Sequence, residues 1–147
     1  MKIQVHNKIN IRVLTKKKII ELTKWLCEEI KLPIKTLDII FTDDEYLRIL
    51  HEKFLNDKNY TDVMTFNLGT EGKINGEIYI SCERARHNAL SYHVSPTEEI
   101  CRLIIHACLH LAGYQDKNEE DKIQMKDKED YLLSILSNKF LNKYEIM

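Results

Sequence analysis

The clearest helix start in the sequence lies within residues 95–116, which read SPTEEICRLIIHACLHLAGYQD. Ser95 and Glu98 form a capping-box pair, and Pro96 suits the first helical position, where no backbone N–H donor is needed. Apolar residues then dominate until Gly113, a residue type that commonly ends helices. We therefore expect a helix that begins at Ser95 and ends in a tight turn at Gly113.

Two histidines on this helix form a candidate metal site. His106 and His110 are four residues apart, so both imidazoles project from one face about one turn from each other. A left-handed residue at Gly113 can turn the chain back, so that Asp116 can reach the same ion. The pattern HxxxHxxGxxD matches the helix and turn of the extended zinc-protease motif, whose third ligand is a histidine. Three protein ligands leave room for water or substrate, which favours hydrolytic chemistry.

The competing interpretation is that the histidines are a partly buried pair on an apolar helix. A peptidase of the HExxH type needs a glutamate as general base, but Ala107 occupies that position, so peptide hydrolysis by that mechanism is not predicted. Cys108 lies two residues from each histidine, about 200° around the helix, and should face the core. Cys108 is therefore not expected to be a ligand.

The composition is that of one ordinary globular domain, residues 1–147, with 44% apolar and 31% charged residues. The formal net charge of −1 provides no whole-molecule field that could hold a polyanion, so any contact with nucleic acid needs a local patch. Arg84, Arg86 and His87, or the run Lys16–Lys18, could contact phosphates or could simply face solvent.

Targeting and redox signals point to the cytoplasm. The first residues, MKIQVHNKINIRVL, alternate apolar and polar side chains and lack the apolar core of a secretion signal. No stretch approaches the ~20 apolar residues of a membrane span. The four cysteines form no CxxC pair, so we expect buried apolar side chains rather than disulfides. We expect a soluble, cytoplasmic protein with no membrane partner.

Hydrophobic periodicity outlines the remaining elements. One or two short strands are predicted at the start, from Ile3 to Val5 and around residues 9–13, and further strands at 37–41, 63–68 and 74–80. Helices are predicted at 15–31, 42–54, 82–92 and 118–137, the last with Ile123, Leu132, Leu133 and Leu136 as its apolar positions. The Gly-containing loop 69–73 predicts an antiparallel hairpin. We expect an α+β fold in which a mixed sheet of about four strands is covered by about five helices, with the metal site on a central helix and the turn after it.

Residues 106–116, HACLHLAGYQD, resemble the signature HGxLHLxGYDH of the YbeY family of rRNA-maturation endoribonucleases. Further similarity lies in order along the chain, from about residue 38 to residue 136. The matching segments are Leu55-Asn56, Thr61-Asp62-Val63-Met64-Thr65-Phe66 and Gly76-Glu77-Ile78, followed by Met125 and Glu129 on the last helix.

The resemblance implies a metal-dependent, single-strand-acting endoribonuclease in rRNA processing and ribosome maturation. Its partners would be ribosomal RNA precursors and the small ribosomal subunit, and its cofactor one Zn²⁺ per chain. Asp116 replaces the third histidine of the family, which admits Mn²⁺, Ni²⁺ or Fe²⁺ more readily. The loop before Thr61 is shorter than in the family and lacks the arginine thought to serve catalysis. Lys58 is its nearest cation, and Asp62 lies beside the metal site by resemblance.

Two other interpretations stay open at this point. The protein could be a ribosome-assembly factor with a mainly structural metal and little catalysis. It could also be a non-haem iron enzyme, because two histidines and one carboxylate are the ligand set of that class. The remaining departure, Ala107 in place of the usual glycine, exchanges one small residue for another on a helix.

Overall fold

The computed structural model describes residues 1–7, 14–69 and 72–141. Its elements, in chain order, are β1 (Lys2–His6), α1 (Lys16–Glu29), β2 (Ile34–Thr42), α2 (Asp44–Leu55), β3 (Val63–Asn67), β4 (Ile74–Ser81), α3 (Cys82–Tyr92), α4 (Pro96–Leu111) and α5 (Glu119–Phe140). The expected α+β fold with a four-stranded mixed sheet and five helices is confirmed. The second strand expected around residues 9–13 lies outside the described residues.

The sheet has the strand order β1-β2-β4-β3. β1 and β4 both run parallel to β2, and β3 pairs antiparallel with β4, as the hairpin prediction required. Along β4, Ile78 and Ile80 are buried while Tyr79 between them is only partly buried. This alternation of period two gives the sheet one core face and one outer face.

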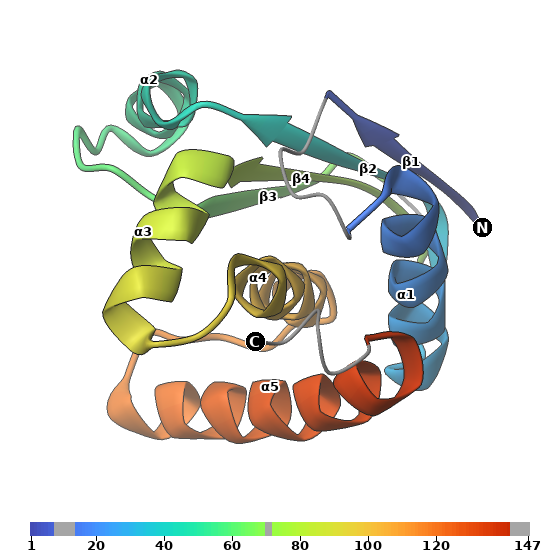
Figure 1. Ribbon diagram of the computed structural model, residues 1–147. Helices are drawn as coiled ribbons and strands as arrows, with labels where there is room; N and C mark the ends of the chain where they lie inside the picture. The colour runs from blue at the N-terminus through green and yellow to red at the C-terminus, as the bar shows by residue number, and fades with distance from the viewer. Residues whose placement is uncertain (8–13, 70–71, 142–147) are drawn as a thin grey trace.

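α4 is enclosed on nearly all sides. It runs beneath the sheet, with α1 on one flank, α3 on the other and α5 across the bottom (Figure 1). Ten of its sixteen residues are buried, as expected for a helix that is apolar around most of its circumference. α2 packs on the outer face of the sheet, where the rings of Phe54 and Phe66 lie 5.2 Å apart. Among the described helices, none is long and apolar enough to cross a membrane.

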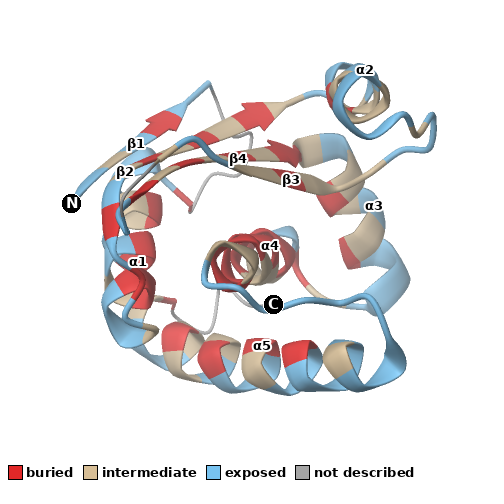
Figure 2. Cartoon of the chain, turned by 180° about the vertical axis from the view of Figure 1, so that it is seen from behind, coloured by how far each residue is buried: buried red, intermediate tan, exposed pale blue. Residues whose placement is uncertain are grey.

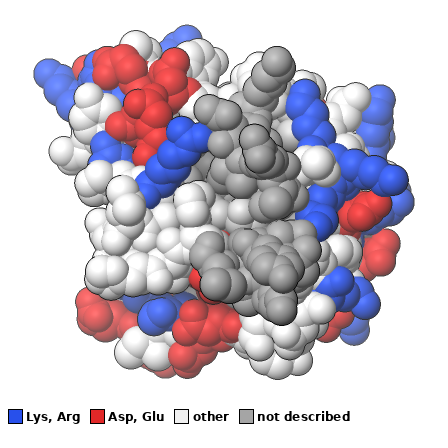
Figure 3. Space-filling model, viewed as in Figure 1, with Lys and Arg blue, Asp and Glu red and all other residues white. Residues whose placement is uncertain are grey.

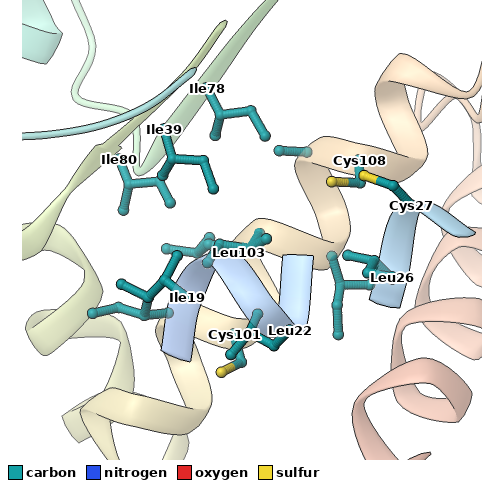
Figure 4. Close-up of a cluster of buried hydrophobic side chains, with 14 of the residues drawn as sticks. Ile19, Leu22, Leu26, Cys27, Ile39, Ile78, Ile80, Cys101, Leu103 and Cys108 are labelled. Atoms are coloured by element: carbon teal, nitrogen blue, oxygen red, sulfur yellow. The ribbon is translucent and has the colours of Figure 1, made fainter. Parts of the chain in front are cut away.

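The core lies between the sheet, α1 and α4. Figure 4 shows Leu103 and Cys108 of α4 between apolar side chains of the sheet and of α1. The labelled neighbours are Ile39, Ile78 and Ile80 on the sheet, and Ile19, Leu22, Leu26 and Cys27 on α1. Cys108 faces this core, as its place on the helix predicted, and all four cysteines are free.

Two details of the sequence prediction are wrong. Cys82 was expected to be buried but is half-buried, because it begins α3 at the margin of the core. Ile123, which was expected to belong to the apolar face of the last helix, is 60% exposed. The buried face of α5 includes Met125, and a residue two positions earlier points to nearly the opposite side of a helix.

Gly76 permits a close approach between the sheet and the end of α4. A Cβ atom added to Gly76 would lie 2.9 Å from Cδ1 of Leu37 and 3.2 Å from Cδ1 of Leu111. Leu111 is the last residue of α4, one position after His110. The absence of a side chain at Gly76 therefore sets how closely the histidine-bearing end of α4 packs on the sheet.

We expect Gly76→Val to destabilise the fold by about 1–3 kcal/mol, the usual cost of overpacking a core. The measurement is urea unfolding followed by circular dichroism. Lys35→Val is the matched control, because Lys35 is an exposed position on the neighbouring strand β2. Equal stability of the two variants would contradict the close packing described for Gly76.

Candidate metal centre

His106 and His110 point their ring nitrogens at each other from successive turns of α4. Their Nε2 atoms lie 3.0 Å apart, and the two rings are arranged edge to face. The side chains are 21% and 29% exposed, so they can be reached from solvent. The predicted sharing of one helical face is confirmed by this geometry.

The turn after α4 brings Asp116 back to the histidines. Gly113 has φ +103°, its N–H donates to the carbonyl of His110, and the N–H of Tyr114 donates to the carbonyl of Leu109, both at 3.0 Å. These paired bonds form a Schellman motif, in which a left-handed glycine ends the helix and reverses the chain. The Oδ2 atom of Asp116 then lies 3.5 Å from Nε2 of His110 and 3.7 Å from Nε2 of His106.

The three atoms fit one small divalent ion. Their mutual separations run from 3.0 to 3.7 Å. Zinc bonds of about 2.0–2.2 Å at tetrahedral angles place neighbouring ligand atoms about 3.3–3.6 Å apart. Among the described residues, His106, His110 and Asp116 form the group of potential metal ligands whose donor atoms all lie within 4.8 Å of one another. Two imidazoles and a carboxylate can therefore hold one ion and leave part of its coordination open.

Hydrogen bonds on the far side of each ring orient the ligand nitrogens. The Nδ1–H of His110 donates to the backbone carbonyl of Tyr114 at 3.1 Å, and the Nδ1–H of His106 donates to the carboxylate of Glu129 at 2.8 Å. A carbonyl or carboxylate oxygen can only accept, so the proton sits on Nδ1 and the Nε2 lone pair faces the site. Such partners fix the tautomer and raise the basicity of a metal-ligating histidine.

The electrostatic surroundings of His106 favour a bound positive charge. Burial alone lowers the pKa of His106, but the hydrogen bond from its ring to Glu129 and the charge of that carboxylate outweigh burial and raise it. The carboxylates of Asp116 and Asp62 add to the increase. An environment that stabilises an imidazolium also stabilises a metal cation at the same ring, because both place positive charge there.

Glu129 has a structural role that sequence reasoning missed. It is 5% exposed, and its second carboxylate oxygen accepts from Arg102, which also binds the buried Glu99. Glu129 was singled out only through the family resemblance. A signal was present in the sequence, since Glu129 interrupts an otherwise apolar stripe on α5 formed by Met125, Leu132 and Leu136.

The sequence also indicated Asp62 and Lys58 as supporting residues of the site, and the structure places them differently. Asp62 lies just before β3, and its Oδ2 accepts from the side-chain amide of Asn88 at 3.0 Å. Its charge acts on His106, so it lies near the candidate site. Lys58 is exposed in the loop after α2, and no hydrogen bond or ion pair among the described residues joins it to the three ligands. Of the two supporting candidates, Asp62 is the one with a structural connection to the site.

The described side chains form no uniformly basic surface on the face seen in Figure 3. Basic and acidic side chains are intermixed there over α2 and α5, and basic ones predominate over α1. Arg84 is held by Asp44 at 2.7 Å, and its guanidinium lies over the ring of Tyr60. Arg84 is therefore engaged within the protein rather than presented to a phosphate. Lys16 and Lys17 are exposed at the start of α1.

A groove leads away from the candidate site between α4 and α5. Its volume is about 720 Å³, and His106 and Asp116 form part of its lining. Its lining also includes Arg102, Met125 and Tyr92, the last residue of α3. The chain that joins α4 to α5 is exposed (Figure 2). An extended ligand could therefore contact the ligand set from solvent.

The fold and this site define an α+β protein with a candidate open metal centre of two histidines and one aspartate. Over residues 2–137 the chain matches the family described as Endoribonuclease YbeY. The chain belongs to the endoribonuclease YbeY family.

Individual relatives agree with this family. The protein named endoribonuclease YbeY from Karelsulcia muelleri is 44% identical over 108 residues, which cover 74% of this chain and 77% of the relative. That of Cytophaga hutchinsonii is 40% identical over 119 residues, covering 78% and 83%. The solution structure of a protein from Thermotoga maritima superposes with a TM-score of 0.64 at 23% identity, covering 92% of this chain and 89% of the other. This last similarity establishes the fold.

Removal of one ligand should abolish stoichiometric metal binding. We expect the purified protein to bind one Zn²⁺ or Co²⁺ per chain, and His110→Ala to weaken binding by more than the about 10–100-fold typical of losing a supporting residue. His87→Ala, at an exposed histidine of α3, is the control. The measurements are elemental analysis and chelator competition. Retention of a full equivalent of metal by His110→Ala would show that the ion binds elsewhere.

The turn at Gly113 should be needed for metal affinity. A Cβ atom there would meet no neighbour within 4 Å, so Gly113→Ala adds only backbone strain, about 1–2 kcal/mol for a left-handed residue. We expect this loss in urea unfolding of the metal-free protein, and weaker Co²⁺ binding because the turn places Asp116. Gly113→Asn should lose less, since asparagine tolerates positive φ. Identical behaviour of both variants and wild type would contradict the role of the turn.

Proposed function

We propose that His106, His110 and Asp116 hold one divalent ion and that residues 1–147 act as a single metal-dependent endoribonuclease domain. The observation that carries the proposal is the convergence of two Nε2 atoms and one carboxylate oxygen within 3.7 Å, beside an open groove. Membership in the endoribonuclease YbeY family supports RNA as the substrate. Zn²⁺ is the proposed ion, and the carboxylate ligand also suits Mn²⁺, Ni²⁺ or Fe²⁺.

The chemistry proposed for the site is hydrolysis or transesterification of a phosphodiester. A divalent ion bound there supplies Lewis acidity to a phosphoryl oxygen and lowers the pKa of coordinated water. His106 and His110 keep their protons on Nδ1, turned away from the substrate. Asp62, fixed by Asn88, is the candidate supporting carboxylate, whereas Lys58 is free to approach a phosphate only from the exposed loop after α2.

The proposed substrate is single-stranded RNA within ribosomal RNA precursors, delivered in association with the small ribosomal subunit in the cytoplasm. Two features of the molecule support a single strand. The groove lies beside the candidate ligands, and its lining includes the exposed aromatic ring of Tyr92, a common platform for an unpaired base. A net charge of −1 is consistent with local rather than global attraction for RNA.

The second candidate is a non-haem iron enzyme, which the two-histidine, one-carboxylate ligand set favours. The two candidates differ in metal and co-substrate. An iron enzyme would turn over only with Fe²⁺ and oxygen, whereas an endoribonuclease would cleave RNA with a redox-inert ion such as Zn²⁺.

The decisive assay is cleavage of a structured fragment of small-subunit ribosomal RNA by metal-loaded protein. We expect cuts in single-stranded segments, a rate that falls on the order of 100-fold or more in His110→Ala through loss of the ion, and no change in Lys35→Val, the control on the exposed position of β2. Gel analysis of end-labelled RNA measures both rates.

Three results would contradict the proposal. Cleavage that persists in metal-free His110→Ala protein would show that the metal is not needed. Intact RNA combined with firm binding to the small subunit would favour an assembly factor with a structural metal. Oxygen-dependent turnover with Fe²⁺ would favour the iron enzyme.

A further inference from the structure

A hydrogen-bonded network of buried and half-buried polar side chains runs from the candidate metal site across three helices. The carboxylate of Glu129 accepts from Nδ1–H of His106 at 2.8 Å and from Nη1 of Arg102 at 3.1 Å. Arg102 then binds Glu99 through two parallel bonds of 2.8 and 2.6 Å. Asn88 on α3 donates to Glu99 at 3.2 Å and to Asp62 at 3.0 Å. This network of hydrogen bonds connects α3, α4 and α5 with the residue before β3.

Burying the two carboxylates of this network costs free energy, because they lose their hydration. The side chains of Glu99 and Glu129 are 1% and 7% exposed, and Arg102 is their shared cationic partner. Buried carboxylates lose hydration, and an ion pair in such a place seldom stabilises a fold more than well-packed apolar residues would. Stability alone therefore gives little reason to place two acids and an arginine beside a metal ligand.

The guanidinium of Arg102 holds both carboxylates in fixed directions. Its planar guanidinium engages Glu99 with two nitrogens and Glu129 with a third, which a flexible ammonium group could not reproduce. The ring of Tyr92 lies 5.8 Å from the guanidinium carbon on the groove side. Glu129 is thereby left with one oxygen aimed at His106.

We propose that Arg102 is a positioning residue for the metal centre. Through Glu129 it holds the ring of His106 with Nε2 directed at His110 and Asp116. With both carboxylates ionised, the group of Glu99, Arg102 and Glu129 also carries a net charge of −1, which strengthens Nε2 as a donor to a cation. This inference rests on the metal site proposed above and adds a residue that contacts neither the ion nor the substrate.

The structure offers a matched control on another helix. Arg48 of α2 also bridges two glutamates, with Nη2 2.6 Å from Glu45 and Nη1 3.3 Å from Glu52. Its side chain is 24% exposed, close to the 28% of Arg102, but its partners are more exposed and contact neither histidine. Arg48→Met therefore removes a comparable bridge away from the site.

The experiment compares Co²⁺ binding by wild type, Arg102→Met, Arg102→Lys, Glu129→Gln and Arg48→Met as full-length proteins. Chelator competition measures affinity, the visible spectrum of bound Co²⁺ reports ligand geometry, and urea unfolding of the metal-free proteins measures stability. We expect about 10–100-fold weaker binding and an altered spectrum for Arg102→Met. Arg102→Lys should recover part of the affinity, and Arg48→Met should match wild type in both binding measurements.

Glu129→Gln keeps the shape of the side chain and an acceptor oxygen but removes the charge. If Arg102→Met does not fold, Co²⁺ binding by Glu129→Gln tests whether the network behind His106 supports the metal site. Weakened Co²⁺ binding in this variant supports the proposal. If wild type binds Co²⁺ and folded Arg102→Met binds with wild-type affinity and spectrum, the positioning role of Arg102 is overturned while the metal site stands; the same result for Glu129→Gln overturns it if Arg102→Met does not fold. If wild type binds no Co²⁺, both are overturned.

Discussion

The enclosure of α4 is the constraint from which the rest of the structure follows. A helix with apolar residues around most of its surface is stable in water only when other elements cover it. The sheet, α1, α3 and α5 together provide that cover (Figure 1). His106 lies on the side of α4 that lines the groove beside α5, and His110 lies one turn further along the helix with its ring against that of His106. The same helix therefore organises the core and presents the ligand set.

Polar groups that enter this enclosure need partners supplied by distant parts of the chain. His106 finds its partner in Glu129, twenty-three residues later on α5, and Glu129 in turn depends on Arg102. The packing of α5 against α4 thus has two consequences, since it buries apolar surface and brings a carboxylate to the ring of a candidate metal ligand. A shift of α5 would disturb both.

Asp116 gives the centre a different charge from a site of three neutral imidazoles. At an occupied site its carboxylate would lower the net charge of the divalent ion and so weaken its Lewis acidity, while broadening the range of metals that suit the site. It is 46% exposed at its side chain and is held in place by the turn at Gly113 rather than by burial. The local backbone, more than the core, therefore determines where this ligand lies.

The sequence alone determined much of the local structure. Periodicity and capping residues predicted the order and type of the described elements, and the spacing of His106, His110, Gly113 and Asp116 predicted the candidate ligand set, because helix and turn geometry is local. The exposure of Ile123 and of Cys82 was missed, since burial depends on neighbouring elements.

Only the tertiary structure decided the strand order and the network behind His106. Both depend on contacts between residues far apart in the chain, and a glutamate in a helical sequence gives no sign of which arginine or histidine will lie beside it once the helices have packed.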